Sequence, residues 1–122
     1  MKIFKILVAA LAFATLSFAG EAFDKAKFDK LVADGKDVVV HIHAPWCGTC
    51  KKQDNVLSDI AKTSGDKVSF LTVDFDSQKD VVKGFGANDR SVIIVFKEGK
   101  EVSRTFYETN AGKIKEQLKP VL

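Results

Sequence analysis

Cys47 and Cys50 are the only cysteines of this 122-residue chain, and their spacing suits reversible sulfur chemistry. They follow a β-branched apolar stretch and precede a stretch with helical periodicity, in the run Ala-Pro-Trp-Cys-Gly-Thr-Cys-Lys. Unpaired N–H groups and the helix dipole favour a thiolate at the first turn of a helix, which makes Cys47 the candidate nucleophile. Cys50, one turn further on, is expected to be more buried and to resolve a mixed disulfide formed at Cys47. Gly48 and Thr49, between the cysteines, are expected to tune the redox potential.

A purely stabilising disulfide is the simpler alternative for this pair. Its loop is so short that it would constrain the unfolded chain only weakly. It would also give no role to the neighbouring Trp46. Redox activity therefore explains the motif better than a structural disulfide does.

The first 19 residues have the pattern of a cleaved secretory signal peptide. Lys2 and Lys5 precede an almost continuous apolar run over residues 6–19, and Ser17 and Ala19 are small residues at the spacing that a signal peptidase accepts. The run is shorter than the roughly 20 residues that span a bilayer, so we expect no stable membrane insertion. Residues 20–122 would then form the mature protein, periplasmic or otherwise secreted.

Composition and charge narrow the function classes further. Apolar residues make up 46% of the chain and charged residues 29%, as in ordinary globular proteins. Without Lys2 and Lys5, 17 of the 19 basic residues remain against 16 acidic ones, so a nucleic-acid partner is not expected. The length suits a single domain over residues 20–122, and no helix has the pattern of a dimer interface, so we expect a monomer.

Hydrophobic periodicity predicts an α/β order for the elements that position the cysteines. Helices are expected at 23–33, 45–62 and 78–83, with a last one capped by Thr109 or Asn110. Strands are expected at 38–43, 68–75, 91–97 and 101–107, the last two forming a hairpin. Strand–helix–strand crossovers demand parallel pairing. A central mixed sheet of four, or five, strands with helices on both faces follows.

From about Phe28 to Leu118, the chain resembles the thioredoxin family. The resemblance rests on the runs Trp-Cys-Gly-Thr-Cys-Lys, Val-Asp at 73–74 and Phe-Lys-Glu-Gly at 96–99. It implies a thioredoxin fold, thiol–disulfide oxidoreductase activity without a cofactor, and protein thiols or disulfides as substrates. It also implies a membrane or soluble redox partner that recycles the pair, and a substrate groove lined by Trp46.

Several positions depart from the family pattern. Ser91 stands in the place of the family's cis-proline, so a trans Arg90–Ser91 peptide is expected, with Arg90 and Ser91 still facing the substrate. Tyr107 stands where a groove glycine is usual and is expected to narrow the substrate site. His41 aligns with the family's buried acid and is a candidate proton relay for Cys50. His43 lies on the same side of the strand, where a hydrogen bond to Asp74 is a further hypothesis.

Two other functions fit parts of the sequence. His41, His43, Cys47 and Cys50 together offer two nitrogens and two sulfurs, a donor set that suits Zn²⁺ or copper. A redox-inactive binding scaffold is the other alternative, suggested by the changes at Ser91 and Tyr107. The leading interpretation remains an extracytoplasmic thiol–disulfide oxidoreductase, and we expect it to act as a reductase of disulfides.

Overall fold

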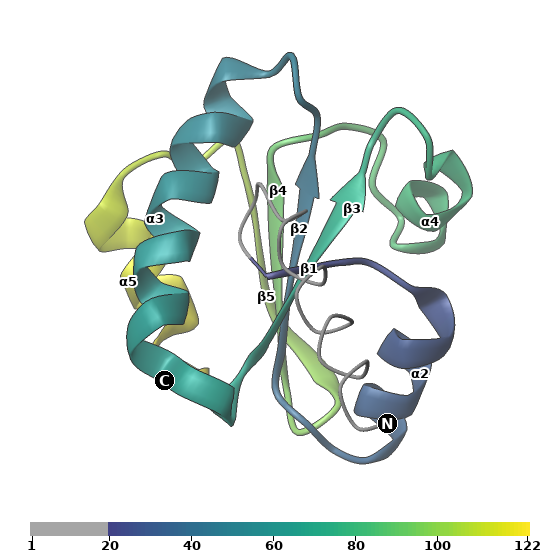
Figure 1. Ribbon diagram of the computed structural model, residues 1–122, viewed down its shortest axis with the longest axis vertical. Coiled ribbons are helices and arrows are strands. Elements are labelled where there is room, and N and C mark those ends of the chain that lie inside the picture. Colours follow the sequence, from purple (N-terminus) through teal and green to yellow (C-terminus); the bar gives the residue numbers. More distant parts are fainter. Residues whose placement is uncertain (1–19) are drawn as a thin grey trace, which may run out of the picture.

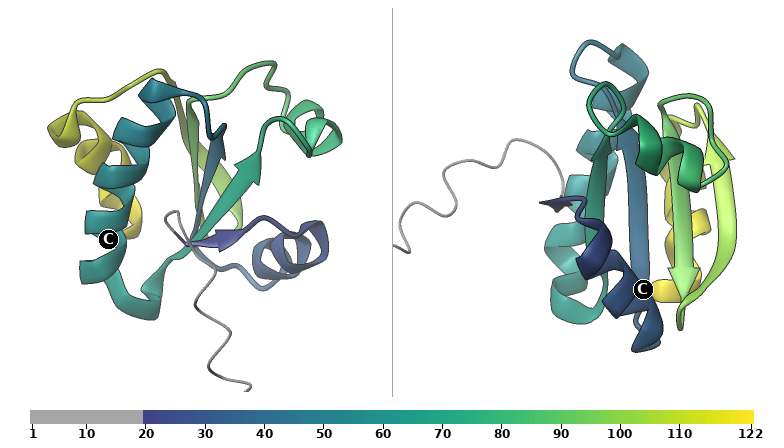
Figure 2. Two further views of the ribbon diagram at one scale, coloured as in Figure 1. Left: turned by 45° about the horizontal axis from the view of Figure 1, so that its top comes forward. Right: turned by 90° about the vertical axis from the view of Figure 1, so that its right-hand side faces the viewer.

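The structure is a computed structural model that describes residues 20–122; the predicted signal peptide, residues 1–19, lies outside the described residues. One mixed sheet of five strands runs through this part of the chain in the order β1-β3-β2-β4-β5. Its strands are β1 (Glu21–Ala22), β2 (Val38–His43), β3 (Ser69–Asp74), β4 (Val92–Lys97) and β5 (Lys100–Phe106). β1 and β2 pair with β3 in parallel, whereas β4 is antiparallel to both β2 and β5. The side view in Figure 2 shows this order across the sheet.

Helices cover both faces of the sheet. α3 (Gly48–Ser64) and α5 (Ala111–Leu118) lie on one face, and α2 (Lys25–Ala33) and α4 (Lys79–Gly84) lie on the other (Figure 1). Two short 3-10 helices, Gly65–Lys67 and Lys119–Val121, follow α3 and α5. This arrangement confirms the predicted α/β architecture, with the fifth strand reduced to two residues.

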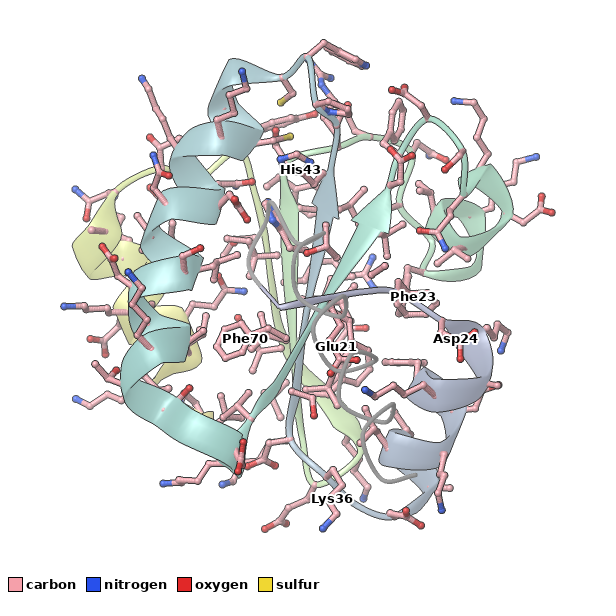
Figure 3. All side chains as sticks on the ribbon, in the orientation of Figure 1. Glu21, Phe23, Asp24, Lys36, His43 and Phe70 are labelled. Atoms are coloured by element: carbon pink, nitrogen blue, oxygen red, sulfur yellow. The ribbon has the colours of Figure 1, made fainter. Side chains whose placement is uncertain are left out.

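Alternate residues of β2 enter two separate hydrophobic cores. Val39 packs with residues of α3 and α5, whereas Val38, Val40 and Ile42 pack on the α2 and α4 side. Figure 3 shows the same division, with Phe70 of β3 on the α3 side and Phe23 on the α2 side. Because β2 is central and covered on both faces, its nearly continuous apolar run is what a buried strand requires. His41 is therefore placed on the α3 face, inside the protein.

The predicted helices and strands are confirmed, but the predicted start of α3 at Pro45 is wrong. Pro45 lies in a turn before the helix, where the N–H of Cys47 donates to the carbonyl oxygen of Ala44 at 3.1 Å. Pro45 is then the second residue of a four-residue turn, a position that suits its fixed φ. The helix begins only at Gly48, which leaves Cys47 as its N-cap.

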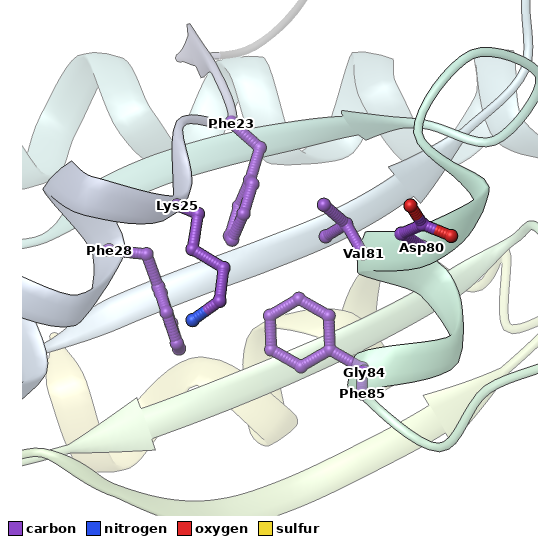
Figure 4. Close-up of a pocket in the computed structure, with 7 residues that line it drawn as sticks. All are labelled: Phe23, Lys25, Phe28, Asp80, Val81, Gly84 and Phe85. Carbon is purple, nitrogen blue, oxygen red and sulfur yellow. The ribbon is translucent and has the colours of Figure 1, made fainter.

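A small apolar cavity of about 210 Å³ lies between α2 and α4, away from the cysteines. Its walls are seven residues without a cysteine or histidine: Phe23, Lys25, Phe28, Asp80, Val81, Gly84 and Phe85 (Figure 4). Among the described helices, none combines the length and the apolar character needed to cross a bilayer.

Candidate active site

The sulfur of Cys47 caps the N-terminus of α3. Cys47 has extended backbone angles, and its Sγ accepts a hydrogen bond from the backbone N–H of Cys50 at 3.1 Å. A thiolate accepts this bond better than a thiol does, and the positive end of the helix dipole favours the same charge. The N-cap position therefore supports the role of nucleophile predicted for Cys47.

Cys50 lies one turn into the helix and is completely buried, whereas 4% of Cys47 is exposed. Both thiols are free, and they pack with Ala44 and the ring of Phe75. Cys47 is therefore itself nearly buried, with little of its surface open to solvent. The order of burial still makes Cys47 the thiol that a partner meets first.

The loop before β4 brings Ser91 between the two sulfurs. Ser91 Oγ lies 3.2 Å from Cys47 Sγ and 3.2 Å from Cys50 Sγ. The described residues contain no cis peptide bond, so the predicted trans Arg90–Ser91 peptide is confirmed. Ser91 has a φ of 65°, in the left-handed region that residues other than glycine rarely adopt.

The two thiols have opposite pKa shifts. Burial alone would raise the pKa of Cys47, but hydrogen bonds from Cys50 and Ser91 outweigh it and hold the pKa below its ordinary value. Arg90 favours the Cys47 thiolate as well. Burial and the hydrogen bond with Cys47 raise the pKa of Cys50. Of the two thiols, Cys47 is therefore the one that loses its proton more readily.

His41 is buried on the α3 face of β2 and is held by Gln53. His41 Nε2 lies 2.9 Å from Gln53 Oε1, and Gln53 Nε2 donates to the carbonyl oxygens of Ser91 at 3.1 Å and Glu108 at 3.0 Å. Because the amide nitrogen of Gln53 is used by two carbonyls, its oxygen must accept from His41. His41 therefore carries its proton on Nε2, and Nδ1 has no partner in the part of the chain that the structure describes.

Burial lowers the pKa of His41 to about 4, despite the hydrogen bond that His41 donates to Gln53, which favours the charged form. The imidazole is therefore neutral near pH 7. The Cys50 sulfur contacts Cys47, Ser91, the backbone of Ala44 and, at 4.0 Å, the Ile42 carbonyl oxygen. The proton-relay role of His41 stays a prediction, because within residues 20–122 the hydrogen bonds of His41 reach the cysteines through Gln53 and Ser91 and not directly.

His43 lies at the end of β2, near the first turn of α3 (Figure 3). Its ring meets that of His41 edge to face, with the centroids 5.5 Å apart. Within residues 20–122, His43 and Asp74 share no hydrogen bond; Asp74 instead accepts from the hydroxyl of Ser77 at 2.6 Å. Burial lowers the pKa of His43, and the charges of Asp54 and Asp74 oppose that shift.

The metal-binding alternative receives no support from the geometry of residues 20–122. No three side chains among their His, Cys, Asp and Glu residues come close enough together to hold an ion. His41 and His43 do not form one ligand set with the two sulfurs.

A polar and aromatic surface surrounds Cys47. Trp46 is 60% exposed, and its indole N–H donates to Asp76 Oδ2 at 2.8 Å. The guanidinium of Arg90 lies 5.1 Å from the centre of the Trp46 ring and pairs with Asp89. Asp89 in turn accepts a hydrogen bond from the hydroxyl of Tyr107. The predicted substrate-binding residues Trp46, Arg90, Ser91 and Tyr107 thus lie together around the nucleophile.

Tyr107 occupies a backbone conformation that suits glycine. Its φ is 61°, and its backbone N–H donates to the carbonyl oxygen of Ser91 at 2.8 Å. That hydrogen bond joins the loop before β4 to the end of β5. The ring stays half exposed beside the site, which is consistent with the narrowing predicted for it.

Sequence reasoning missed Gln53, Asp76 and Asp89. Gln53 is fully buried and belongs to the buried face of α3, formed by Cys50, Gln53, Leu57 and Ile60. This spacing of three, four and three residues is that of the buried face of an amphipathic helix. A polar residue on that face was the signal in the sequence that could have identified Gln53 as a functional residue. Asp76 and Asp89 lie in loops, where no periodicity marks them.

Comparison with known proteins agrees with this geometry. The family model described as Thioredoxin matches residues 20–120. A thioredoxin H-type 1 of Nicotiana tabacum is 35% identical over 116 residues, covering 89% of this chain and 87% of its own. A thioredoxin of Mycoplasmoides gallisepticum is 29% identical over 96 residues, covering 79% of this chain and 95% of its own. The crystal structure of Trxlp from Edwardsiella tarda superposes with a TM-score of 0.75 at 28% identity, covering 80% and 96% of the two chains. With its paired cysteines at the start of α3, the chain belongs to the thioredoxin family and is a thiol–disulfide oxidoreductase.

Proposed function

We propose that residues 20–122 act outside the cytoplasm as a reductase of protein disulfides. The Cys47 thiolate attacks a substrate disulfide and forms a mixed disulfide, releasing one substrate thiolate. Cys50 then attacks Cys47, forms the Cys47–Cys50 disulfide and releases the second substrate thiol. A membrane or soluble partner returns the pair to the reduced state.

The observation that carries the proposal is the capping of α3 by the Cys47 sulfur, with Cys50 buried one turn on. The extracytoplasmic location is supported by the basic and apolar pattern of residues 1–19. The reductive direction is supported by the relatives named thioredoxin. Gly48 and Thr49, which form the first turn of α3 with Cys50, are the positions proposed to tune the potential.

Reduction of a protein disulfide by the mature chain tests this proposal. With a chemical reductant present, the unchanged chain should reduce a disulfide-bonded protein catalytically, and Cys47→Ser should abolish this turnover. Cys50→Ser should accumulate a mixed disulfide between Cys47 and the substrate, visible by non-reducing electrophoresis and intact mass. If Cys47→Ser retains full turnover, or if neither variant differs from the parent chain, the protein is a binding scaffold instead.

The location is tested separately by expression of the full chain in a bacterium with an outer membrane. Cleavage near Ala19 and recovery in the periplasmic fraction are expected. A full-length chain in the cytoplasmic fraction would refute the proposed location and leave the sulfur chemistry untouched.

A further inference from the structure

Ser91 contacts both of the reacting sulfurs. Its hydroxyl lies 3.2 Å from each of them, and 99% of the residue is buried. A hydroxyl has one proton to donate and two lone pairs that accept. The Ser91 hydroxyl can therefore donate to only one sulfur at a time. A hydrogen bond with the other sulfur forms only if the thiol of that cysteine donates its S–H to Ser91 Oγ.

The positions of the two sulfurs decide the direction of these hydrogen bonds. Cys47 already accepts from the backbone N–H of Cys50 at the helix N-terminus, so it is the better site for negative charge. Cys50 is completely buried, and the acceptors near its S–H are the Cys47 sulfur, Ser91 Oγ at 3.2 Å and the Ile42 carbonyl oxygen at 4.0 Å. Once Cys47 is bonded to a substrate sulfur it carries no negative charge. Ser91 Oγ is then the best-placed acceptor for the Cys50 S–H, and the Ser91 O–H can donate to the sulfurs of the mixed disulfide.

The backbone holds Ser91 in this place at a conformational cost. Its left-handed φ is maintained by a hydrogen bond from its N–H to the Ile42 carbonyl at 2.8 Å. Its own carbonyl oxygen accepts from Tyr107 N at 2.8 Å and from Gln53 Nε2 at 3.1 Å. Strained conformations persist when the surroundings determine them in this way, and they concentrate at functional sites. A proline at this position would lack the N–H, and its φ near −65° would not match.

We propose that the Ser91 hydroxyl is a catalytic group that carries the Cys50 proton to the departing substrate sulfur; this role rests on the proposed function. In the mixed disulfide, the substrate sulfur is bonded to Cys47 at about 2.05 Å, which brings it near Ser91. Cys50 attacks Cys47 Sγ as its proton passes to Ser91 Oγ. The Cys47–substrate bond breaks, and the original hydroxyl proton of Ser91 passes to the departing sulfur. The Cys47–Cys50 disulfide and a neutral substrate thiol result, with Ser91 again a hydroxyl.

The test compares leaving groups that differ in their need for a proton. The reduced chain is mixed rapidly with excess glutathione disulfide or with an excess of a diaryl disulfide, quenched in acid and analysed by intact mass. The decay of the mixed disulfide gives the rate of resolution. An aryl thiolate has a low pKa and leaves without protonation, whereas the glutathione thiolate is a poorer leaving group.

Removal of the hydroxyl should slow resolution of the glutathione adduct by about tenfold and that of the aryl adduct by less than about threefold. Ser91→Ala and Ser91→Gly should behave alike, although glycine relieves the left-handed strain, and Ser91→Thr should restore the parent rate. Ser64→Ala, which removes a partly buried hydroxyl that donates to Ala61, is the matched control and should have no effect.

Equal slowing of both adducts, or rates within about twofold of the parent for both, would overturn the proposal. So would a change in Ser91→Ala that is absent from Ser91→Gly, because strain and not the hydroxyl would then be the cause. In each case, formation of the mixed disulfide by the parent chain shows that the thiol–disulfide exchange of the proposed function is intact. Failure of the parent chain to form it would refute that function itself.

Discussion

Replacement of the buried Gln53 by methionine removes the polar contacts that support Ser91 while nearly keeping the volume of the side chain. The change removes three hydrogen bonds, which join Gln53 to His41, Ser91 and Glu108. The Ser91 carbonyl keeps its bond from Tyr107, and the half-buried Glu108 carbonyl can be reached by water. The Nε2–H of His41 has no such substitute, because only 2% of that residue is exposed.

The expected cost follows from this count. A buried donor left without a partner costs about 1–3 kcal/mol, and the two weakened carbonyl contacts add to it, so we expect a loss of about 2–4 kcal/mol. For a domain of roughly 100 residues, this lowers Tm by about 10–25 °C. Urea unfolding followed by circular dichroism measures the loss, with the slope m unchanged if the native fold is kept.

Gln117→Met is a matched control at a distance from the sulfurs. Gln117 is also buried, accepts from the Thr105 hydroxyl at 2.8 Å and donates to the Ile93 carbonyl oxygen at 2.9 Å. Both variants should be destabilised. Only Gln53→Met should slow the resolution of a mixed disulfide, by about tenfold, because Gln53 positions Ser91. Equal rates in the two variants, or a loss of stability below about 0.5 kcal/mol for Gln53→Met, would refute the reasoning.

Two further predictions concern His41 and Tyr107. Because burial lowers the pKa of His41 from 6.5 to about 4, the unfolded chain takes up this proton first as the pH falls. The contribution of His41 to the free energy of unfolding should therefore be constant above about pH 6.5 and should fall by on the order of 3 kcal/mol as the pH drops towards 4. His41→Leu should remove most of this pH dependence. An imidazole that titrates near pH 6.5 by NMR would contradict this. Tyr107→Gly relieves a left-handed φ but loses the hydrogen bond to Asp89, so stability should stay within about 1 kcal/mol of the parent. The KM for a protein disulfide should fall as the site widens; a higher KM would show that the ring binds substrate instead.

The main elements of the fold could be predicted because their signals are local. The β-branched apolar run over residues 38–43 predicted a strand, and the structure confirms β2 there, with Val38, Val39 and Val40 buried. The start of α3 could not be predicted from helix-start preferences. Pro45 suits the first turn of a helix and also the second position of a turn, and the Cys47 cap decides between them.

Local sequence alone predicted the part of the site that lies within one motif, and the family resemblance was needed for the rest. Cys47, Cys50 and Trp46 are nearly adjacent in sequence, so their proximity needed no tertiary information. Ser91 was found by its alignment, but its place between both sulfurs depends on the left-handed backbone that Gln53 and Tyr107 hold. Such a conformation arises from contacts between distant segments, which no periodicity in the sequence records.

The equilibrium redox potential of the Cys47–Cys50 pair tests the central claim most directly. A chain of residues 20–122, freed of metal, is titrated with glutathione and followed by the fluorescence of Trp46, with Cys50→Ser as the control that cannot form the disulfide. A reductase of this family should equilibrate near −270 mV, about the value of thioredoxin. A potential near −120 mV would mark a donor of disulfides and contradict the proposed direction. A pair that never equilibrates with glutathione would contradict the thiol–disulfide exchange itself.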